Sequence, residues 1–143
     1  MSALLLCSCD RSTIYSSAYT LPASGWDMDS AVHFDFKVNE PATAYDVVIF
    51  VRHRDNYPYQ NMWLIVENMP SATADTIEFY LADQRGRWLG SGMGKTKQMP
   101  VLYEQNYHFA DSCCSMSIRH AMRDETLHGV SDIGLRITKS EGQ

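Results

Sequence analysis

The sequence predicts an all-β fold, an antiparallel β-sandwich with jelly-roll-like topology and about seven or eight strands. Short segments that alternate apolar and polar residues recur along the chain, and turn-forming residues separate them. No segment has the apolar spacing of an amphipathic helix, and no internal repeat is visible. The length of 143 residues is typical of one domain and sufficient for a buried core.

The first nine residues resemble the end of a bacterial lipoprotein signal peptide. Leu6-Cys7-Ser8-Cys9 is similar to a lipobox, with a small residue just before the acceptor cysteine and a branched apolar residue two places before that. The resemblance implies that residues 1–8 are removed as a signal segment and that Cys9 carries diacylglycerol and an amide-linked acyl chain. Several chains make a stable membrane anchor, since each buried CH₂ contributes about 0.8 kcal/mol. The alternative is a cytosolic protein with an apolar first turn, because the motif is short and no basic residue precedes it.

Residues 9–20 are expected to form the lipidated cysteine and a flexible tether, because residues 10–20 are rich in Ser and Thr. The folded domain is then predicted to span residues 21–143. Its first clear strand begins at Val32, since apolar residues occupy every second position up to Val38.

The remaining strands follow in order. Residues 45–52 are a nearly continuous β-branched and aromatic run, as expected for a central strand buried on both faces. Residues 62–67 and 76–82 form two more strands, and the turn at 83–86 is of the kind that closes a hairpin. Every second residue from Cys114 to Met122 falls on one face of a further strand, and residues 130–138 supply the last.

Composition narrows the class of function. The chain is 45% hydrophobic and 11% aromatic, which is typical of a folded protein rather than a disordered one. Its formal charge of −5 gives no basic footprint for nucleic acid, so no nucleic-acid partner is expected. No stretch after the cysteines approaches the roughly 20 consecutive apolar residues of a membrane-spanning helix. Lipid on Cys9 is therefore the expected membrane attachment.

Cys113 and Cys114 are neighbours, and they can pair only with each other once Cys7 is removed and Cys9 is acylated. Consecutive Cα atoms are about 3.8 Å apart, shorter than the roughly 4.4–6.8 Å of ordinary disulfides. Two free thiols, one of them buried, are favoured over a redox or metal site.

Some residue patterns suggest a nucleotide-binding, metal or catalytic site, but each lacks a feature that such a site requires. Gly90 lies one residue too close to Gly94-Lys95-Thr96 for a Walker A loop, so a wide loop or bulge is expected there. His120, Asp124 and His128 would share a face only in a helix, whereas the pattern predicts a strand and then a turn. No serine lies in a nucleophile elbow. We therefore expect no catalytic residues, no metal, no cofactor and no enzymatic activity.

A polar loop after the buried strand of residues 45–52 is the best candidate surface. It contains two tyrosines beside a proline, and aromatic residues serve interfaces and cores alike. The two interpretations remain open: a recognition surface, or tyrosines that cap the sandwich while Asn61 completes the turn. With two motif residues from later in the chain, the candidate interaction surface comprises Arg52, Arg54, Tyr57, Tyr59, Asn61, Trp88 and Arg123.

A family resemblance covers the chain from Trp26 to Ile137. It is carried by the motifs Arg52-x₄-Tyr57-Pro58-Tyr59-x-Asn61, Tyr80-Leu81-Ala82-Asp83, Gly86-x-Trp88-x-Gly90-x-Gly92 and Met122-Arg123-x₃-Leu127-x-Gly129-Val130-x-Asp132-Ile133-Gly134-Leu135-Arg136-Ile137. Together with the lipobox, these resemble the gliding-motility lipoprotein family GldH of Bacteroidetes. Ser112-Cys113-Cys114 departs from the pattern, because a Gly and an aromatic residue are expected there.

The resemblance implies a non-enzymatic lipoprotein of the cell envelope, anchored to a membrane through Cys9 with its domain facing the periplasm. Its implied partners are other envelope proteins of gliding motility and the associated type IX secretion apparatus. The alternative is a carbohydrate-binding module, because sandwiches of this size present exposed aromatic residues to sugars. Tyr57, Tyr59, Trp63 and Trp88 are the candidates for contact with a glycan, and Trp63 is the weakest because it lies in an apolar run.

Overall fold

The computed structural model describes residues 12–69, 73–92 and 94–141, and this part of the chain is all-β with no helix. Its ten strands exceed the expected seven or eight, but two of them are only two residues long. The strands are β1 (Thr13–Thr20), β2 (Trp26–Asp27), β3 (Val32–Lys37), β4 (Tyr45–Arg54), β5 (Asn61–Met69), β6 (Thr73–Tyr80), β7 (Thr96–Tyr107), β8 (Cys113–His120), β9 (Thr126–Leu127) and β10 (Val130–Lys139).

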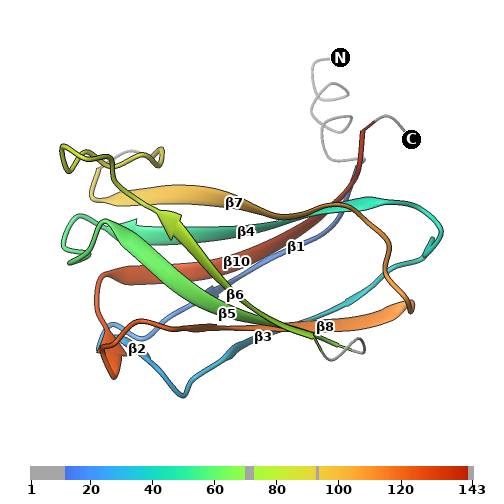
Figure 1. Cartoon of the computed structure of the whole chain (residues 1–143), viewed down its shortest axis with the longest axis horizontal. Coiled ribbons are helices and arrows are strands. Elements are labelled where there is room, and N and C mark those ends of the chain that lie inside the picture. The colour runs from blue at the N-terminus through green and yellow to red at the C-terminus, as the bar shows by residue number, and fades with distance from the viewer. Residues whose placement is uncertain (1–11, 70–72, 93, 142–143) are drawn as a thin grey trace, which may run out of the picture.

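The eight longer strands form a jelly roll. The first sheet has the order β1-β10-β4-β7, the second sheet has the order β3-β8-β5-β6, and the two face each other (Figure 1). All pairs are antiparallel, and four of them are nested: β1 with β10, β3 with β8, β4 with β7 and β5 with β6. This nesting is what results when one long hairpin folds over into two sheets. The prediction of an antiparallel jelly-roll sandwich is confirmed.

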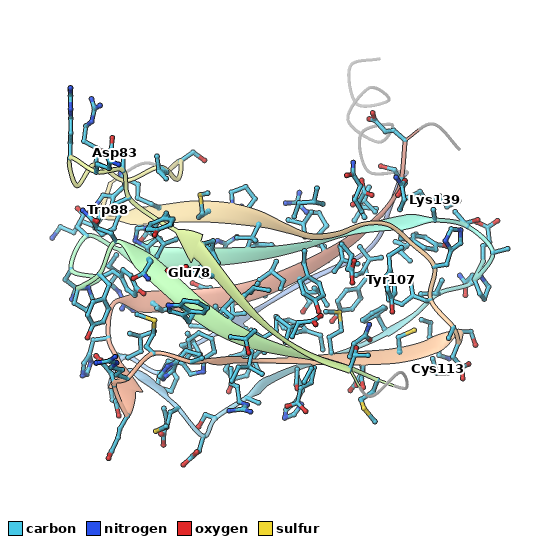
Figure 2. The ribbon with its side chains drawn as sticks, in the orientation of Figure 1. Glu78, Asp83, Trp88, Tyr107, Cys113 and Lys139 are labelled. Atoms are coloured by element: carbon cyan, nitrogen blue, oxygen red, sulfur yellow. The ribbon has the colours of Figure 1, made fainter. Side chains whose placement is uncertain are left out.

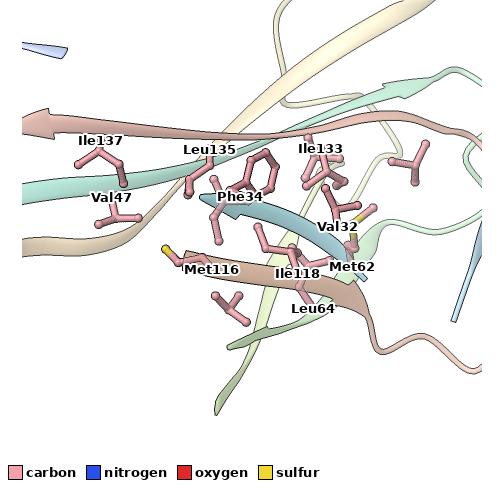
Figure 3. Close-up of a cluster of buried hydrophobic side chains, with 14 of the residues drawn as sticks. Val32, Phe34, Val47, Met62, Leu64, Met116, Ile118, Ile133, Leu135 and Ile137 are labelled. Carbon is pink, nitrogen blue, oxygen red and sulfur yellow. The ribbon is translucent and has the colours of Figure 1, made fainter. Parts of the chain in front are cut away.

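Alternation along the strands builds the core. In β3 and β8 every second side chain is buried, as the period-two pattern predicts. Side chains from the inner faces of both sheets meet between the layers (Figure 3), including Val32, Phe34, Val47, Met62, Leu64, Met116, Ile118, Ile133, Leu135 and Ile137. Each is less than 4% exposed, so the core is continuous from one end of the sandwich to the other.

A two-stranded ribbon of β2 and β9 closes one end of the sandwich. Trp26 and Leu127 pair across it, and both side chains are fully buried. The Trp26 indole N–H donates to the Ser30 carbonyl at 2.8 Å, which satisfies the polar atom of this otherwise apolar side chain. Segments of two residues are too short to show an alternation of apolar and polar residues, so the sequence does not predict these strands.

The segment expected to be a tether contains a strand. β1 pairs with β10 from Thr13 to Thr20, and Tyr15 packs against Phe36 with ring centroids 5.2 Å apart. The prediction of a flexible tether over residues 9–20 is therefore wrong for residues 13–20, and the sandwich begins before residue 21. Ser and Thr suit this edge strand because its last five residues are exposed. The predicted signal segment and Cys9 lie outside the described residues.

β7 was also missed. Its polar residues and Pro100 obscure the strand pattern, but β7 lies at a sheet edge, where proline is tolerated. The expected turn at 83–86 is present: the backbone N–H groups of Arg85 and Arg87 donate to the Asp83 carboxylate, each at 2.9 Å. It closes only the isolated bridge between Ala82 and Trp88, because β6 and β7 belong to different sheets.

One aromatic ring lies on the outer face of the first sheet. Phe50 is only 5% exposed because it covers Gly134 of the neighbouring strand, while the guanidinium groups of Arg52 and Arg136 each lie 5.7 Å from its ring centroid. A Cβ at Gly134 would lie 2.0 Å from the Phe50 ring. The glycine in the motif Ile133-Gly134-Leu135 therefore makes room for this ring.

Gly134→Ala should lower the free energy of unfolding by about 1–3 kcal/mol, because the ring must leave its place between two arginines. Urea unfolding measures the loss, with Ala18→Ser as the matched control, since Ala18 is exposed and pairs with Gly134 in the sheet. In a Phe50→Leu background the penalty should shrink. An equal penalty in both backgrounds would show that the ring contact is not its cause.

Candidate functional site

A groove of about 290 Å³ lies at the end of the sandwich where β5 begins. One wall is formed by Tyr59 and the start of β5. The other wall is formed by the segment that follows β8. This segment leaves the sheet at His120, which brings its side chains beside β5. The groove is lined by Tyr59, Asn61, Trp63, Ala121, Met122, Arg123 and Asp124.

Two hydrogen bonds hold the polar side chains of the groove. The Tyr59 hydroxyl donates to the Asp124 carboxylate at 2.6 Å, joining the two walls. This bond raises the pKa of Tyr59, because the carboxylate stabilises the protonated phenol. The Asn61 amide donates to the Glu78 carboxylate of β6 at 2.7 Å. These bonds orient the side chains before any ligand arrives.

Aromatic surface adjoins these polar groups. Asn61 and Trp63 are on the outer face of β5, and their partners on β6 are Tyr80 and Glu78. Trp63 is 39% exposed and Tyr80 is 56% exposed, which is high for large side chains within a sheet. The groove therefore combines aromatic faces with amide, carboxylate and guanidinium groups.

Three of the residues proposed from the sequence meet in this groove, namely Tyr59, Asn61 and Arg123. Tyr57 does not, because its side chain is only 4% exposed and its hydroxyl donates to the Asn61 carbonyl at 2.6 Å. Burial also raises the pKa of Tyr57. Its backbone is so close to Gly129 that a Cβ there would lie 2.6 Å from the Tyr57 Cα. Tyr57 thus serves the turn, which was the structural interpretation left open.

The other three proposed residues lie elsewhere. Trp88 packs on the buried ring of His53 with centroids 4.6 Å apart. The Arg52 Nε–H donates to the Gln98 side chain at 2.8 Å on the first sheet. The backbone N–H of Arg54 donates to the Gly129 carbonyl at 2.7 Å. The structure does not bring these residues to the groove.

Trp63 is the residue that sequence reasoning undervalued. The run Met62–Glu67 was treated as apolar throughout, but its burial alternates, so Met62, Leu64 and Val66 face the core and Trp63 faces solvent. The alternation ending at Glu67 was the available signal. Nothing in the sequence indicated that Asp124 would lie beside Tyr59, because the two residues are 65 positions apart.

The histidines and cysteines with metal-ligand potential are dispersed. His120 is buried, Asp124 accepts from Tyr59, and His128 is exposed. Within the residues that the structure describes, no three His, Cys, Asp or Glu side chains are grouped to hold a metal ion. Cys113 is exposed and Cys114 buried, and both are free, as predicted. Burial raises the pKa of Cys114, and its thiol donates to the Asp111 carbonyl at 3.1 Å.

In the described part of the chain, no helix is long and apolar enough to cross a membrane.

These features define a jelly-roll sandwich domain with a groove at one end. Its fold resembles a region of a family GH115 4-O-methyl-α-glucuronidase with specificity for decorated arabinogalactans. The TM-score is 0.51 at 12% identity over 92% of this chain and 18% of that one. The likeness concerns the fold alone, because so low an identity does not carry a site.

Sequence comparison identifies the family. The sequence model of the GldH lipoprotein family matches residues 13–137. A gliding motility lipoprotein GldH homolog of Christiangramia forsetii is 32% identical over 149 residues, which span 96% of this chain and 91% of that protein. Gliding motility lipoprotein GldH of Flavobacterium johnsoniae is 30% identical over 151 residues, 99% of this chain and 94% of that protein. The chain belongs to the GldH lipoprotein family.

Two buried histidines near this end of the sandwich make stability depend on pH. His120 Nε2 lies 3.0 Å from the Trp26 carbonyl, and its Nδ1 accepts from the Met122 N–H at 3.2 Å, so the neutral ring is satisfied. Burial lowers the pKa of His120 and of His53. In the unfolded chain both bind a proton near pH 6.5, so below that pH the unfolded state holds more protons.

The free energy of unfolding should therefore be highest above about pH 6.5 and fall as the pH drops, by at most about 1.4 kcal/mol per pH unit for each histidine. Urea unfolding at pH 7.5 and 5.5 measures the slope. His120→Gln should be less stable at pH 7.5 but lose less on acidification, whereas the exposed control His33→Gln should keep the full slope. Parallel slopes for His120→Gln and the unaltered protein would contradict the assignment.

Proposed function

We propose that this protein is a non-enzymatic, membrane-anchored lipoprotein of the cell envelope that contributes to gliding motility and the associated type IX secretion apparatus. It acts through protein–protein contacts. The observation that carries the proposal is the groove at the start of β5, together with membership of a family in which a relative is named a gliding motility lipoprotein.

The membrane attachment is proposed from the sequence. Leu6, Ser8 and Cys9 satisfy the spacing of a lipobox, and the family is one of lipoproteins. Cys9 would carry the acyl chains, which bury enough CH₂ groups for a stable anchor. The domain would face the periplasm.

The groove has the composition of a protein-binding surface. Tryptophan, tyrosine and arginine are the residues that contribute most to binding energy at protein interfaces, and Tyr59, Trp63 and Arg123 line this groove together. The bonds of Tyr59 to Asp124 and of Asn61 to Glu78 hold its polar groups in place, so less side-chain entropy is lost on binding.

Crosslinked pull-down of the full-length tagged protein from solubilised envelopes should recover motility or secretion proteins, identified by mass spectrometry. Trp63→Ala combined with Arg123→Ala should reduce their recovery at least tenfold, which corresponds to about 1.4 kcal/mol or more of lost binding free energy. Leu102→Ala is the matched control, because Leu102 is a 55% exposed apolar side chain on the other sheet. Cys9→Ala should release a folded protein from the membrane fraction.

Equal recovery with the groove variant and with Leu102→Ala would refute the groove as the contact surface. Unchanged membrane fractionation of Cys9→Ala would refute the anchor.

A carbohydrate-binding role is the second candidate, and one specific arrangement favours it. Trp63 and Tyr80 present exposed rings on one face of the second sheet, with the Asn61–Glu78 hydrogen bond between their strands. Aromatic faces stack on apolar sugar faces while amide and carboxylate groups bind hydroxyls. The candidates Tyr57 and Trp88 are withdrawn, because Tyr57 is buried and Trp88 packs on His53.

Titration of tryptophan fluorescence with a broad glycan panel tests this second role. Of the three tryptophans, Trp26 is buried and Trp88 half-buried, so a saturable change should disappear in Trp63→Phe and persist in Trp88→Phe. A flat response across the panel excludes the carbohydrate role and leaves the protein-contact proposal untouched.

A further inference from the structure

We infer that the anchor also orients the domain: the end of the sandwich that carries Lys139 and Cys113 faces the lipid bilayer, and the groove faces away from it. The inference rests on the proposed acylation of Cys9. It identifies the surface of the domain that faces the membrane. It also sets the distance from the bilayer at which a protein bound to the groove must lie.

The connection between the anchor and the fold is short. The Ser12 carbonyl accepts a hydrogen bond from the Lys139 N–H at 2.7 Å, and Thr13 already pairs with Thr138. Cys9 is three residue steps before Ser12, and a fully extended chain covers at most about 3.6 Å per step, or about 11 Å in total. Ser12 therefore stays within about 11 Å of the acylated residue.

The strand registers show which residues share this end with Ser12. Lys139 pairs with Tyr45 at the start of β4, and Tyr45 pairs with Tyr107 at the end of β7. In the second sheet, Lys37 pairs with Cys113 at the corresponding end, since β3 runs into the loop that leads to β4. Figure 2 shows Lys139, Tyr107 and Cys113 at one end of the molecule and Asp83 and Trp88 at the other.

The groove lies at the end opposite to Lys139. It begins at Asn61, the partner of Tyr80, and the loop that contains Asp83 and Trp88 follows Tyr80 directly. β4 runs the length of the sandwich in ten residues, which at about 3.3 Å per residue is about 30 Å. The groove is thus held roughly 30 Å beyond the end that the connection ties to the membrane.

The surface at the Lys139 end suits contact with lipid. A hollow of about 510 Å³ is lined by Phe36, Met69 and the two cysteines, with Lys37 and Asp35 at its polar side. Met69 is 50% exposed, and Lys37 is exposed as well. Apolar side chains beside a lysine fit the boundary between acyl chains and phosphate groups.

Lying flat would remove charged groups from water. The outer face of the second sheet carries Glu67 and Glu78, together with Arg119, which lies 4.0 Å from Glu67. Pressing this face onto a bilayer would take these groups out of water, which is costly. An end-on arrangement keeps them in water.

The native thiol of Cys113 provides a direct test. In the mature lipidated protein Cys9 is blocked and Cys114 is buried, so Cys113 is the exposed thiol at the membrane-facing end. The lipidated protein is reconstituted in phosphatidylethanolamine–phosphatidylglycerol vesicles without other proteins and treated with 5 kDa maleimide-polyethylene glycol. We expect labelling at least tenfold slower than after detergent solubilisation.

Two variants complete the test. The first variant combines Cys113→Ser with Gln84→Cys, which moves the thiol to the turn at the end opposite Lys139. This thiol should be labelled at the same rate in vesicles and in detergent. With thirty Gly and Ser residues inserted between Asp10 and Arg11, whose mean span is about 30 Å, Cys113 should label at the detergent rate. Slow labelling with the insert would mean that the sandwich binds lipid without the short connection, which overturns the inference.

Labelling of Cys113 at the same rate in vesicles and in detergent would also overturn the inference, provided that the protein had remained bound to the vesicles. A protein that fails to stay with vesicles, or that carries no acyl chains by mass spectrometry, would instead refute the proposed anchor. The two failures are therefore distinguishable.

Discussion

The pairing of β10 with both β1 and β4 is the interaction on which the rest of the structure depends. It joins the last strand to the first and to the central strand of the same sheet. The inward side chains of β10, Ile133, Leu135 and Ile137, are fully buried in the core. Its outward Gly134 admits the ring of Phe50. One strand thereby determines the core, the packing of an outer face and the end of the sandwich at which Ser12 lies.

The nested topology separates two ends with different chemistry. Because the first strand pairs with the last, the chain enters beside Lys139, and the connections that build the groove collect at the other end. One of these connections follows β8 and another precedes β5, so residues far apart in sequence meet only when β5 and β8 pair in the second sheet. The groove therefore depends on the pairing of β5 with β8, and no isolated segment would contain it.

The sequence alone was sufficient for the strands whose burial alternates, the edge strand β3 among them, and insufficient for β1 and β7, the two edge strands of the first sheet. β3 and β8 were predicted because every second residue faces the core. β1 was missed because an edge strand with exposed side chains can be built of Ser and Thr without loss, and β7 was missed because an edge tolerates proline. The groove could be predicted only in part for a similar reason. The sequence places two tyrosines near Asn61, but the pairing of β5 with β6 and β8 decides which side chains there face solvent.

The family motifs record mainly the requirements of the fold. Tyr57 is buried and bonds to the backbone, Gly129 admits the Tyr57 backbone, and Gly134 admits Phe50. A chain that lost these residues would lose the turn or the sheet before it lost a contact with any partner. Arg123 differs, because it is exposed in the groove, whereas Met122 and Asp124 beside it are half-buried. An exposed residue contributes little to folding, so a role for Arg123 is to be sought in binding, and the same reasoning applies to Trp63.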